Sequence, residues 1–144
     1  ISTSDFYPTL LAAAGLPLPG RQPPLDGIDV LPLLKGERKA RGEPIAFQAP
    51  LKRTDNPFAM PDSLQMALVS DRYKLTSFDG GERYQLFDLL EDPGETRDVA
   101  GRHPERLKHM IEHLVNWANA CEASARGEDY GPSTMEQGRK GNLR

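Results

Sequence analysis

Hydrophobic side chains alternate with small or polar ones in four short segments of this chain, at 45–48, 64–69, 73–78 and 84–89. A period of two residues is typical of β-strands, because successive side chains point to opposite faces of a sheet. The connections at 70–72 and 79–82 are short, and the second contains two glycines that can adopt a positive φ in a hairpin. Consecutive strands with short connections predict an antiparallel meander, with a longer loop at 50–62 between the first two strands.

Two other segments follow the helical period of 3.6 residues. The first, at about 5–14, has Ser4 and Asp5 as candidate N-caps and Gly15 as a candidate C-cap. Its hydrophobic side chains share one face of the helix: Phe6, Leu10, Leu11 and Ala14. Because such a face needs a partner, this helix is predicted to pack on another part of the protein.

The second helix is predicted from Pro104 to about Arg126, with Gly127 as its C-cap. One stripe of this helix is hydrophobic and holds Leu107, Ile111, Leu114, Ala118 and Cys121, with Met110 and Trp117 on its flank. This stripe is predicted to cover the apolar face of the sheet.

These patterns predict an α+β chain: a four-stranded antiparallel sheet packed by a C-terminal helix, preceded by one helix and a Pro-rich linker. The linker holds a short hydrophobic run at 28–34, which predicts about one helical turn docked on a surface. The predicted division is 1–43 as the end of one domain plus the linker, 44–127 as an α+β subdomain, and 128–144 as a polar, aperiodic tail that is mobile or lies along a partner.

The composition of the chain excludes some classes of partner but does not indicate a particular function. With 144 residues and 38% hydrophobic residues, the chain can bury one modest core. A net charge of −3 offers no positive field for nucleic acid or an anionic membrane, and no run approaches the ~18 apolar residues that cross a bilayer. Neither partner is therefore predicted. One cysteine forms no internal disulfide, which leaves the compartment open, and Ile1 at the start suggests a piece of a longer protein.

Four segments carry recognisable motifs. Residues 86–95 run from Leu-Phe-Asp-Leu into Asp-Pro-Gly-Glu, in which Pro93 and Gly94 predict a tight turn, because proline fixes φ and glycine can adopt a positive φ. Residues 4–16 contain Pro-Thr-Leu-Leu before Ala-Gly-Leu, 25–36 join Leu-Asp-Gly to Leu-Leu-Lys-Gly, and 72–75 read Arg-Tyr-Lys-Leu. In this order the segments resemble the C-terminal part of formylglycine-dependent sulfatases, arylsulfatase-like enzymes of the alkaline-phosphatase superfamily.

The resemblance implies that the chain is the C-terminal subdomain of an enzyme that hydrolyses sulfate esters. In that family a formylglycine hydrate attacks sulfur and Ca²⁺ stabilises the sulfate oxygens. The implied partners are the N-terminal catalytic domain of the same protein and a sulfated small molecule or glycan. Self-association through an exposed first helix would also follow, and a periplasmic or secreted location is implied by the family.

This chain holds no catalytic nucleophile of that kind. Formylglycine forms from Cys or Ser in a Cys/Ser-x-Pro-x-Arg motif. Cys121 is followed by Ala123 and Ala125 at the positions of Pro and Arg, and no serine is followed by Pro two residues later. No catalytic or metal-binding residue is predicted in this chain. Ca²⁺ and formylglycine are expected in the rest of the longer protein to which the chain belongs, here called the parent. The chain alone is expected to be inactive.

Other candidate chemistry has a plain structural interpretation. His109 and His113 have the i, i+4 spacing of zinc ligands, but no third ligand is evident and a solvated helix face is predicted. Arg72 and Lys74 are interpreted as charges at a strand edge. The acidic side chains around the turn fit no calcium loop and are predicted to be structural: Asp88, Glu91, Asp92, Glu95 and Asp98.

Lys52 and Arg53 are the candidate substrate-binding residues, because Lys and Arg commonly hold sulfated anions and these two lie in the longest loop of the sheet. The same loop carries Asp55 and Asn56, and the alternative interpretation is a solvated polar loop.

Two rival functions remain open at the level of sequence. One is the same part of a related phosphodiesterase or phosphonate hydrolase, and the other is a stand-alone interaction or carbohydrate-binding module. A self-sufficient module should bury Phe6, Leu10 and Leu11 against its own sheet, whereas a severed subdomain should leave them exposed.

Overall fold

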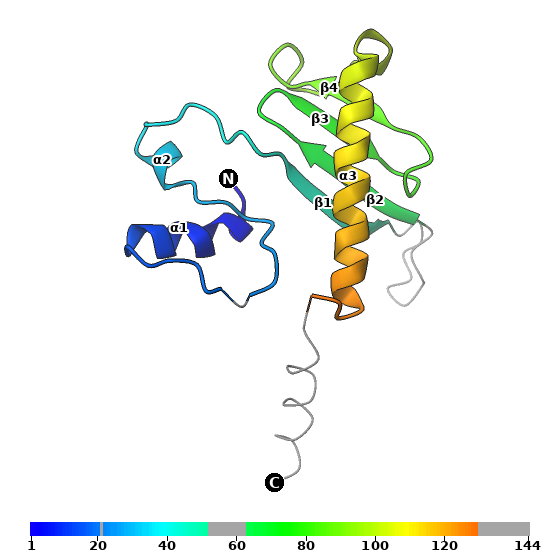
Figure 1. Cartoon of the computed structure of the whole chain (residues 1–144). Coiled ribbons are helices and arrows are strands. Elements are labelled where there is room, and N and C mark those ends of the chain that lie inside the picture. Colours follow the sequence, from blue (N-terminus) through cyan, green and yellow to red (C-terminus); the bar gives the residue numbers. More distant parts are fainter. Residues whose placement is uncertain (21, 52–62, 130–144) are drawn as a thin grey trace.

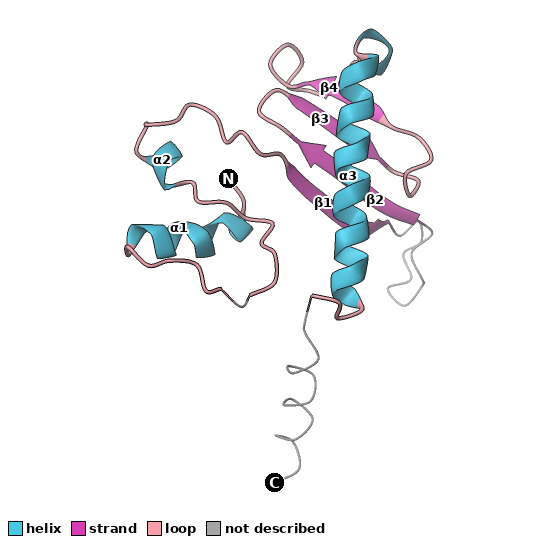
Figure 2. Cartoon of the chain, in the orientation of Figure 1, coloured by secondary structure: helices cyan, strands magenta, loops and turns pink. Residues whose placement is uncertain are grey.

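The computed structural model describes residues 1–20, 22–51 and 63–129. The helices are η1 (Thr3–Asp5), α1 (Phe6–Ala13), α2 (Leu31–Leu34), η2 (Ala100–Arg102) and α3 (Pro104–Ala125). The strands are β1 (Ile45–Leu51), β2 (Ser63–Val69), β3 (Tyr73–Ser77) and β4 (Gln85–Asp88). The predicted α+β class is confirmed, with strands and long helix within a few residues of their predicted positions (Figure 2).

The strands form one antiparallel sheet in the order β1-β2-β3-β4, which is the predicted meander. The register places Leu68, Leu75 and Leu86 opposite one another on three neighbouring strands. Gly80 and Gly81 have φ values of 75° and 97°, so the connection between β3 and β4 uses both predicted glycines.

The core lies between this sheet and α3, which crosses one face of it (Figure 1). Its buried members come from the sheet and from the hydrophobic stripe of α3: Met66, Leu68, Tyr73, Leu75, Leu86, Met110 and Leu114. Leu107, Ile111, Trp117 and Ala118 pack against this cluster while partly exposed. The apolar face of the sheet and the hydrophobic stripe of α3 thus face each other. The predicted packing of α3 on the sheet is confirmed.

The acidic turn after β4 is held by its own carboxylates. Asp92 accepts hydrogen bonds from the backbone N–H groups of Thr96 (2.7 Å) and Arg97 (2.8 Å). The chain turns here as predicted, but the positive φ of 54° belongs to Glu95 and not to Gly94. The Glu95 carboxylate lies 2.6 Å from Lys74 Nζ on β3. A positive φ costs a non-glycine residue of the order of 1 kcal/mol or more, and at Glu95 it occurs together with this ion pair.

The prediction that Arg72 and Lys74 are edge charges is also wrong. β3 lies between β2 and β4 inside the sheet, and both side chains have acidic partners. Arg72 donates to both carboxylate oxygens of Asp88, at distances from 2.6 to 3.1 Å. These hydrogen bonds lower the pKa of Asp88, which in turn accepts the N–H groups of Leu90 and Glu91. Four of the acidic side chains thus have structural partners within the chain, as predicted for this turn: Asp88, Asp92, Glu95 and Asp98.

Candidate functional site

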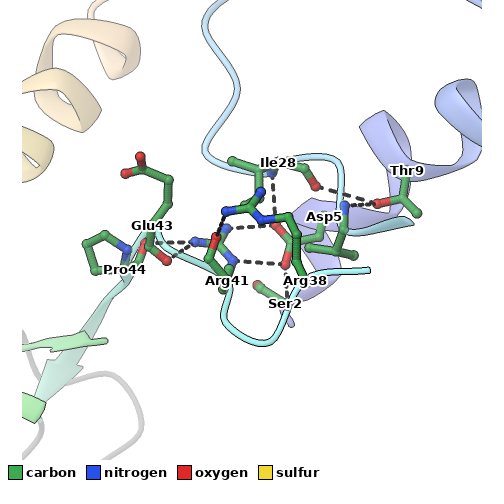
Figure 3. Close-up of polar contacts among 9 residues, drawn as sticks. Ser2, Asp5, Thr9, Ile28, Arg38, Arg41, Glu43 and Pro44 are labelled. Atoms are coloured by element: carbon green, nitrogen blue, oxygen red, sulfur yellow. Dashed lines mark hydrogen bonds and ion pairs between the residues drawn. The ribbon is translucent and has the colours of Figure 1, made fainter. Parts of the chain in front are cut away.

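A buried ion pair joins the start of α1 to the residues before β1. The Asp5 side chain is 0% exposed and that of Arg41 is 7% exposed, and Arg41 Nη2 lies 2.8 Å from Asp5 Oδ1 (Figure 3). Asp5 also accepts the backbone N–H groups of Ser2 at 2.7 Å and of Ile28 at 2.9 Å. Asp5 occupies the N-cap position of α1, as predicted, but its side chain makes no capping hydrogen bond to this helix, because Arg41, Ser2 and Ile28 occupy its carboxylate.

Arg41 extends this junction toward the sheet. Its Nη1 donates to the carbonyl oxygens of Glu43 and, at 3.1 Å, of Pro44, immediately before β1. Its backbone N–H donates to Asp71 in the connection between β2 and β3 at 3.1 Å. One guanidinium and its backbone thus couple the N-terminal segment to the edge strand and to a turn of the sheet.

The segment at 26–30 packs closely against the start of α1. Thr9 Oγ1 accepts the Val30 N–H at 3.0 Å and donates to the Ile28 carbonyl at 3.5 Å (Figure 3). A Cβ on Gly27 would lie 1.9 Å from the carbonyl oxygen of Ser4, so only glycine fits at this position. The Leu-Asp-Gly motif at 25–27 therefore has a steric reason in this fold.

The junction predicts a specific dependence of stability on pH. Burial alone would raise the pKa of Asp5, but hydrogen bonds from Arg41, Ile28 and Ser2 outweigh it and lower the pKa to about 2, from 3.8 for a free side chain. The stabilisation is therefore complete above about pH 4 and is lost as the pH falls through about 2. We expect the stability difference between wild type and Asp5→Asn to shrink by roughly 2 kcal/mol between pH 5 and pH 2.

Urea denaturation at several pH values measures this difference. Subtracting the Asp5→Asn curve removes the contributions of the other acidic residues with lowered pKa, such as Asp88 and Asp92. A difference that is constant from pH 5 to pH 2 would show that the Asp5 carboxylate is not stabilised in the folded state.

The exposed face of α1 distinguishes between the rival interpretations of the sequence. Phe6 and Leu10 are 54% and 68% exposed, while Leu11 is half-buried and the buried side chains of the helix are Pro8 and Thr9. α1 and α2 stand beside the β1 edge of the sheet, and α3 alone lies across its face (Figure 1). The described part of the chain therefore does not bury Phe6 and Leu10, as expected of a severed subdomain.

The predicted substrate-binding residues Lys52 and Arg53 lie outside the described residues, together with Asp55 and Asn56 and with 130–144 of the predicted tail. Cys121 is half-buried on α3, and burial raises the pKa of its thiol.

The two candidate histidines occupy different surroundings on α3. His109 is exposed, as predicted, whereas His113 is half-buried and lines a hollow with Trp117 and Phe47. Trp117 Nε1 donates to Asp26 across this hollow at 3.0 Å. Within the described ranges, no group of three or more His, Cys, Asp or Glu side chains is placed to hold a metal ion.

A second hollow, which sequence reasoning missed, lies at the amino end of α3. It has a volume of about 580 Å³ and is open to solvent. Its lining comprises Tyr73, Arg102, His103, Pro104, Glu105, Arg106 and His109. No helical period in the sequence points to it, because Arg102 ends η2 and Arg106 lies in α3, with the non-helical His103 between them.

Two curated relatives that match most of this chain are sulfatases. Arylsulfatase K of Xenopus laevis is 29% identical over 128 residues, covering 87% of this chain and 23% of that protein. Delta 4,5-hexuronate-2-O-sulfatase of Bacteroides thetaiotaomicron is 28% identical over 111 residues, covering 77% of this chain and 21% of that protein. The chain thus spans about a fifth to a quarter of the length of these curated relatives. No protein-family model matches it.

Solved structures contain the same fold. Ps i-CgsB, determined in complex with k-i-k-neocarrahexaose, matches with a TM-score of 0.63 at 23% identity and covers 92% of this chain and 30% of that one. The phosphonate monoester hydrolase of Agrobacterium radiobacter matches with a TM-score of 0.53 at 24% identity, over 81% of this chain and 24% of that one. The fold of this chain therefore recurs within larger proteins. The described part of the chain has no helix that is long and apolar enough to cross a membrane.

Proposed function

We propose that this chain, a relative of the sulfatases over most of its length, is the C-terminal part of a sulfatase that hydrolyses sulfate esters. The observation that carries the proposal is the similarity to sulfatases along 77–87% of the chain but only 21–23% of their length. The remainder of the parent would supply the formylglycine nucleophile and Ca²⁺. The carboxylates around the turn after β4 do not suit calcium, because Asp88, Asp92 and Glu95 are engaged within the chain.

Within the parent, residues 1–43 would end the catalytic domain and form the linker, and 44–127 would form the subdomain. The exposed hydrophobic face of α1 supports this division, since Phe6 and Leu10 need a covering surface. That surface would be the N-terminal catalytic domain, and in the separated chain the same face would favour self-association. The Asp5–Arg41 junction would transmit the position of the catalytic domain to the sheet.

The substrate would be a sulfated small molecule or glycan. Lys52 and Arg53 in the longest loop would hold its anionic group, because guanidinium and ammonium groups pair with sulfate oxygens. In this role the subdomain supports the catalytic domain and helps to shape the substrate pocket. A periplasmic or secreted location would accord with this function.

A second candidate is the same part of a phosphonate hydrolase. The fold likeness to the phosphonate monoester hydrolase of Agrobacterium radiobacter favours it. The two candidates differ in the substrate that the parent turns over, and both place the chemistry outside this chain. The stand-alone module is disfavoured by the exposure of α1.

The test combines the gene and the enzyme. We expect the reading frame upstream of the Ile1 codon to contain a Cys/Ser-x-Pro-x-Arg motif. The protein encoded by that whole reading frame, here called the contiguous protein, should hydrolyse an aryl sulfate faster than an aryl phosphonate. The 144-residue chain alone should show no turnover of either compound. Turnover by the chain alone would contradict the proposal, and a preference of the contiguous protein for the phosphonate would favour the second candidate.

A further inference from the structure

The hollow at the amino end of α3 is positively charged in a chain whose net charge is −3. Arg102 and Arg106 line it from two helical elements, η2 and α3. Both side chains are exposed, and neither forms an ion pair with any carboxylate in the described ranges. Glu105 contributes the one carboxylate of the lining, so two guanidinium groups face a single negative charge.

The neighbouring Arg72 differs from Arg106 in its hydrogen-bond partners. Arg72 and Arg106 both lie over the ring of Tyr73, with their Cζ atoms 5.3 and 5.2 Å from its centroid. Arg72, however, also binds Asp88 through 2.6–3.1 Å hydrogen bonds from its Nε and Nη2 atoms. Among the residues that the structure describes, the donors of Arg106 have no such partner, so its guanidinium group is available for an anion.

The hollow is also ordered before any ligand arrives. The His103 ring packs edge-on against Tyr73, with centroids 5.5 Å apart, and Tyr73 itself is buried in the core. The stacked position of Arg106 reduces the conformational freedom that binding would remove. Pro104, Glu105 and Arg106 of the first turn line the hollow, so the positive end of the 22-residue helix α3 lies beside it.

These features share one chemical requirement. An oxyanion with several acceptor oxygens can accept hydrogen bonds from two guanidinium forks and from the first turn of a helix. The volume of about 580 Å³ exceeds that of a bare ion and falls in the range typical of small-molecule sites. The ligand should therefore carry its oxyanion on a larger body.

We propose that this hollow binds the sulfate group of a sulfated saccharide. The geometry requires an oxyanion, and the choice of sulfate rests on the proposed function. Arg102 and Arg106 hold the sulfate oxygens, and the sugar lies along the exposed amino end of α3. The site is complete within the described residues and needs neither Lys52 nor Arg53.

The experiment is an NMR titration of the 144-residue chain with a monosulfated disaccharide, the same disaccharide without sulfate, and an unsulfated disaccharide bearing a carboxylate. The sulfated compound should shift the amide resonances of residues 102–109. Equal binding of the unsulfated neutral compound would overturn the proposal, and equal binding of the carboxylated compound would overturn its assignment to sulfate.

Charge variants locate the site. The double variant Arg102→Gln with Arg106→Gln should weaken binding at least tenfold, which is about the effect of losing one charge-assisted hydrogen bond. Glu105→Gln should strengthen binding, because it removes the negative charge from the lining. The matched control is Arg126→Gln, an exposed arginine at the other end of α3 whose loss should change binding by less than about twofold. An effect of Arg126→Gln as large as that of the double variant would overturn the proposal. Circular dichroism establishes that each variant is folded.

The same variants separate this inference from the proposed function. If the contiguous protein hydrolyses aryl sulfate but the hollow binds no sulfated disaccharide, the inference fails and the proposed function stands. If the hollow binds the disaccharide with the expected charge dependence but the contiguous protein cleaves no sulfate ester, the oxyanion site stands and the proposed function fails.

Discussion

Replacing Arg41 by methionine is expected to lower the free energy of unfolding by about 3–5 kcal/mol, the range observed when one partner of a buried ion pair is removed. The variant leaves the Asp5 carboxylate fully buried, with only the N–H groups of Ser2 and Ile28 to compensate its charge. It also removes the donor to the Pro44 carbonyl at the start of β1. Urea denaturation followed by circular dichroism measures the loss.

Hydrogen exchange at the Ile28 amide reports the same event locally, because this N–H donates to Asp5 and exchanges faster when the weakened junction opens more often. The matched control is Arg126→Met, which removes an exposed arginine paired with Glu122 and Glu128 and should cost less than about 1 kcal/mol. A loss for Arg41→Met no larger than that of the control would show that the junction does not hold the N-terminal segment to the sheet.

Replacing Leu114 by alanine is expected to lower the free energy of unfolding by about 2–5 kcal/mol. Leu114 is 0% exposed and belongs to the cluster in which α3 meets the three leucines of the sheet. Truncation removes buried methyl groups and leaves a cavity between two rigid layers that cannot collapse fully. Thermal or urea denaturation measures the effect.

Val115→Ala is the control, one residue further along the same helix. Val115 is 38% exposed, so its truncation removes little buried surface, and alanine has the higher helix propensity. We expect a change within about 0.5 kcal/mol for this variant. Similar losses for the two variants would mean that α3 does not seal the core through the predicted stripe.

The two large effects differ in how well the sequence anticipates them. Leu114 falls on a stripe that the 3.6-residue period reveals directly, and the partner strands reveal their own apolar face by alternation. Arg41 lies in an irregular segment with no periodicity, and Asp5 looks like an ordinary helix cap. Their pairing, 36 residues apart, is visible only when the chain is folded.

The conformation of the turn after β4 shows the same limit. Pro93 and Gly94 correctly indicate where the chain turns, because both residues restrict or extend the backbone locally. The positive φ at Glu95 goes with a tertiary contact, its ion pair with Lys74 on β3. Lys74 and Arg72 look like surface charges in the sequence, since a pattern of residues does not say which carboxylate will lie opposite.

The sequence by itself thus determined the elements, their order, the antiparallel meander and the faces that form the core, because these depend on the local period of hydrophobic residues. Its motifs also indicated the resemblance to sulfatases, which the curated relatives share. Only the tertiary structure decided which charges are paired, that α1 keeps its hydrophobic face exposed, and that Arg102 and Arg106 meet at one hollow. The physical reason is that ion pairs and hollows depend on distances between segments remote in the chain, which no local pattern encodes.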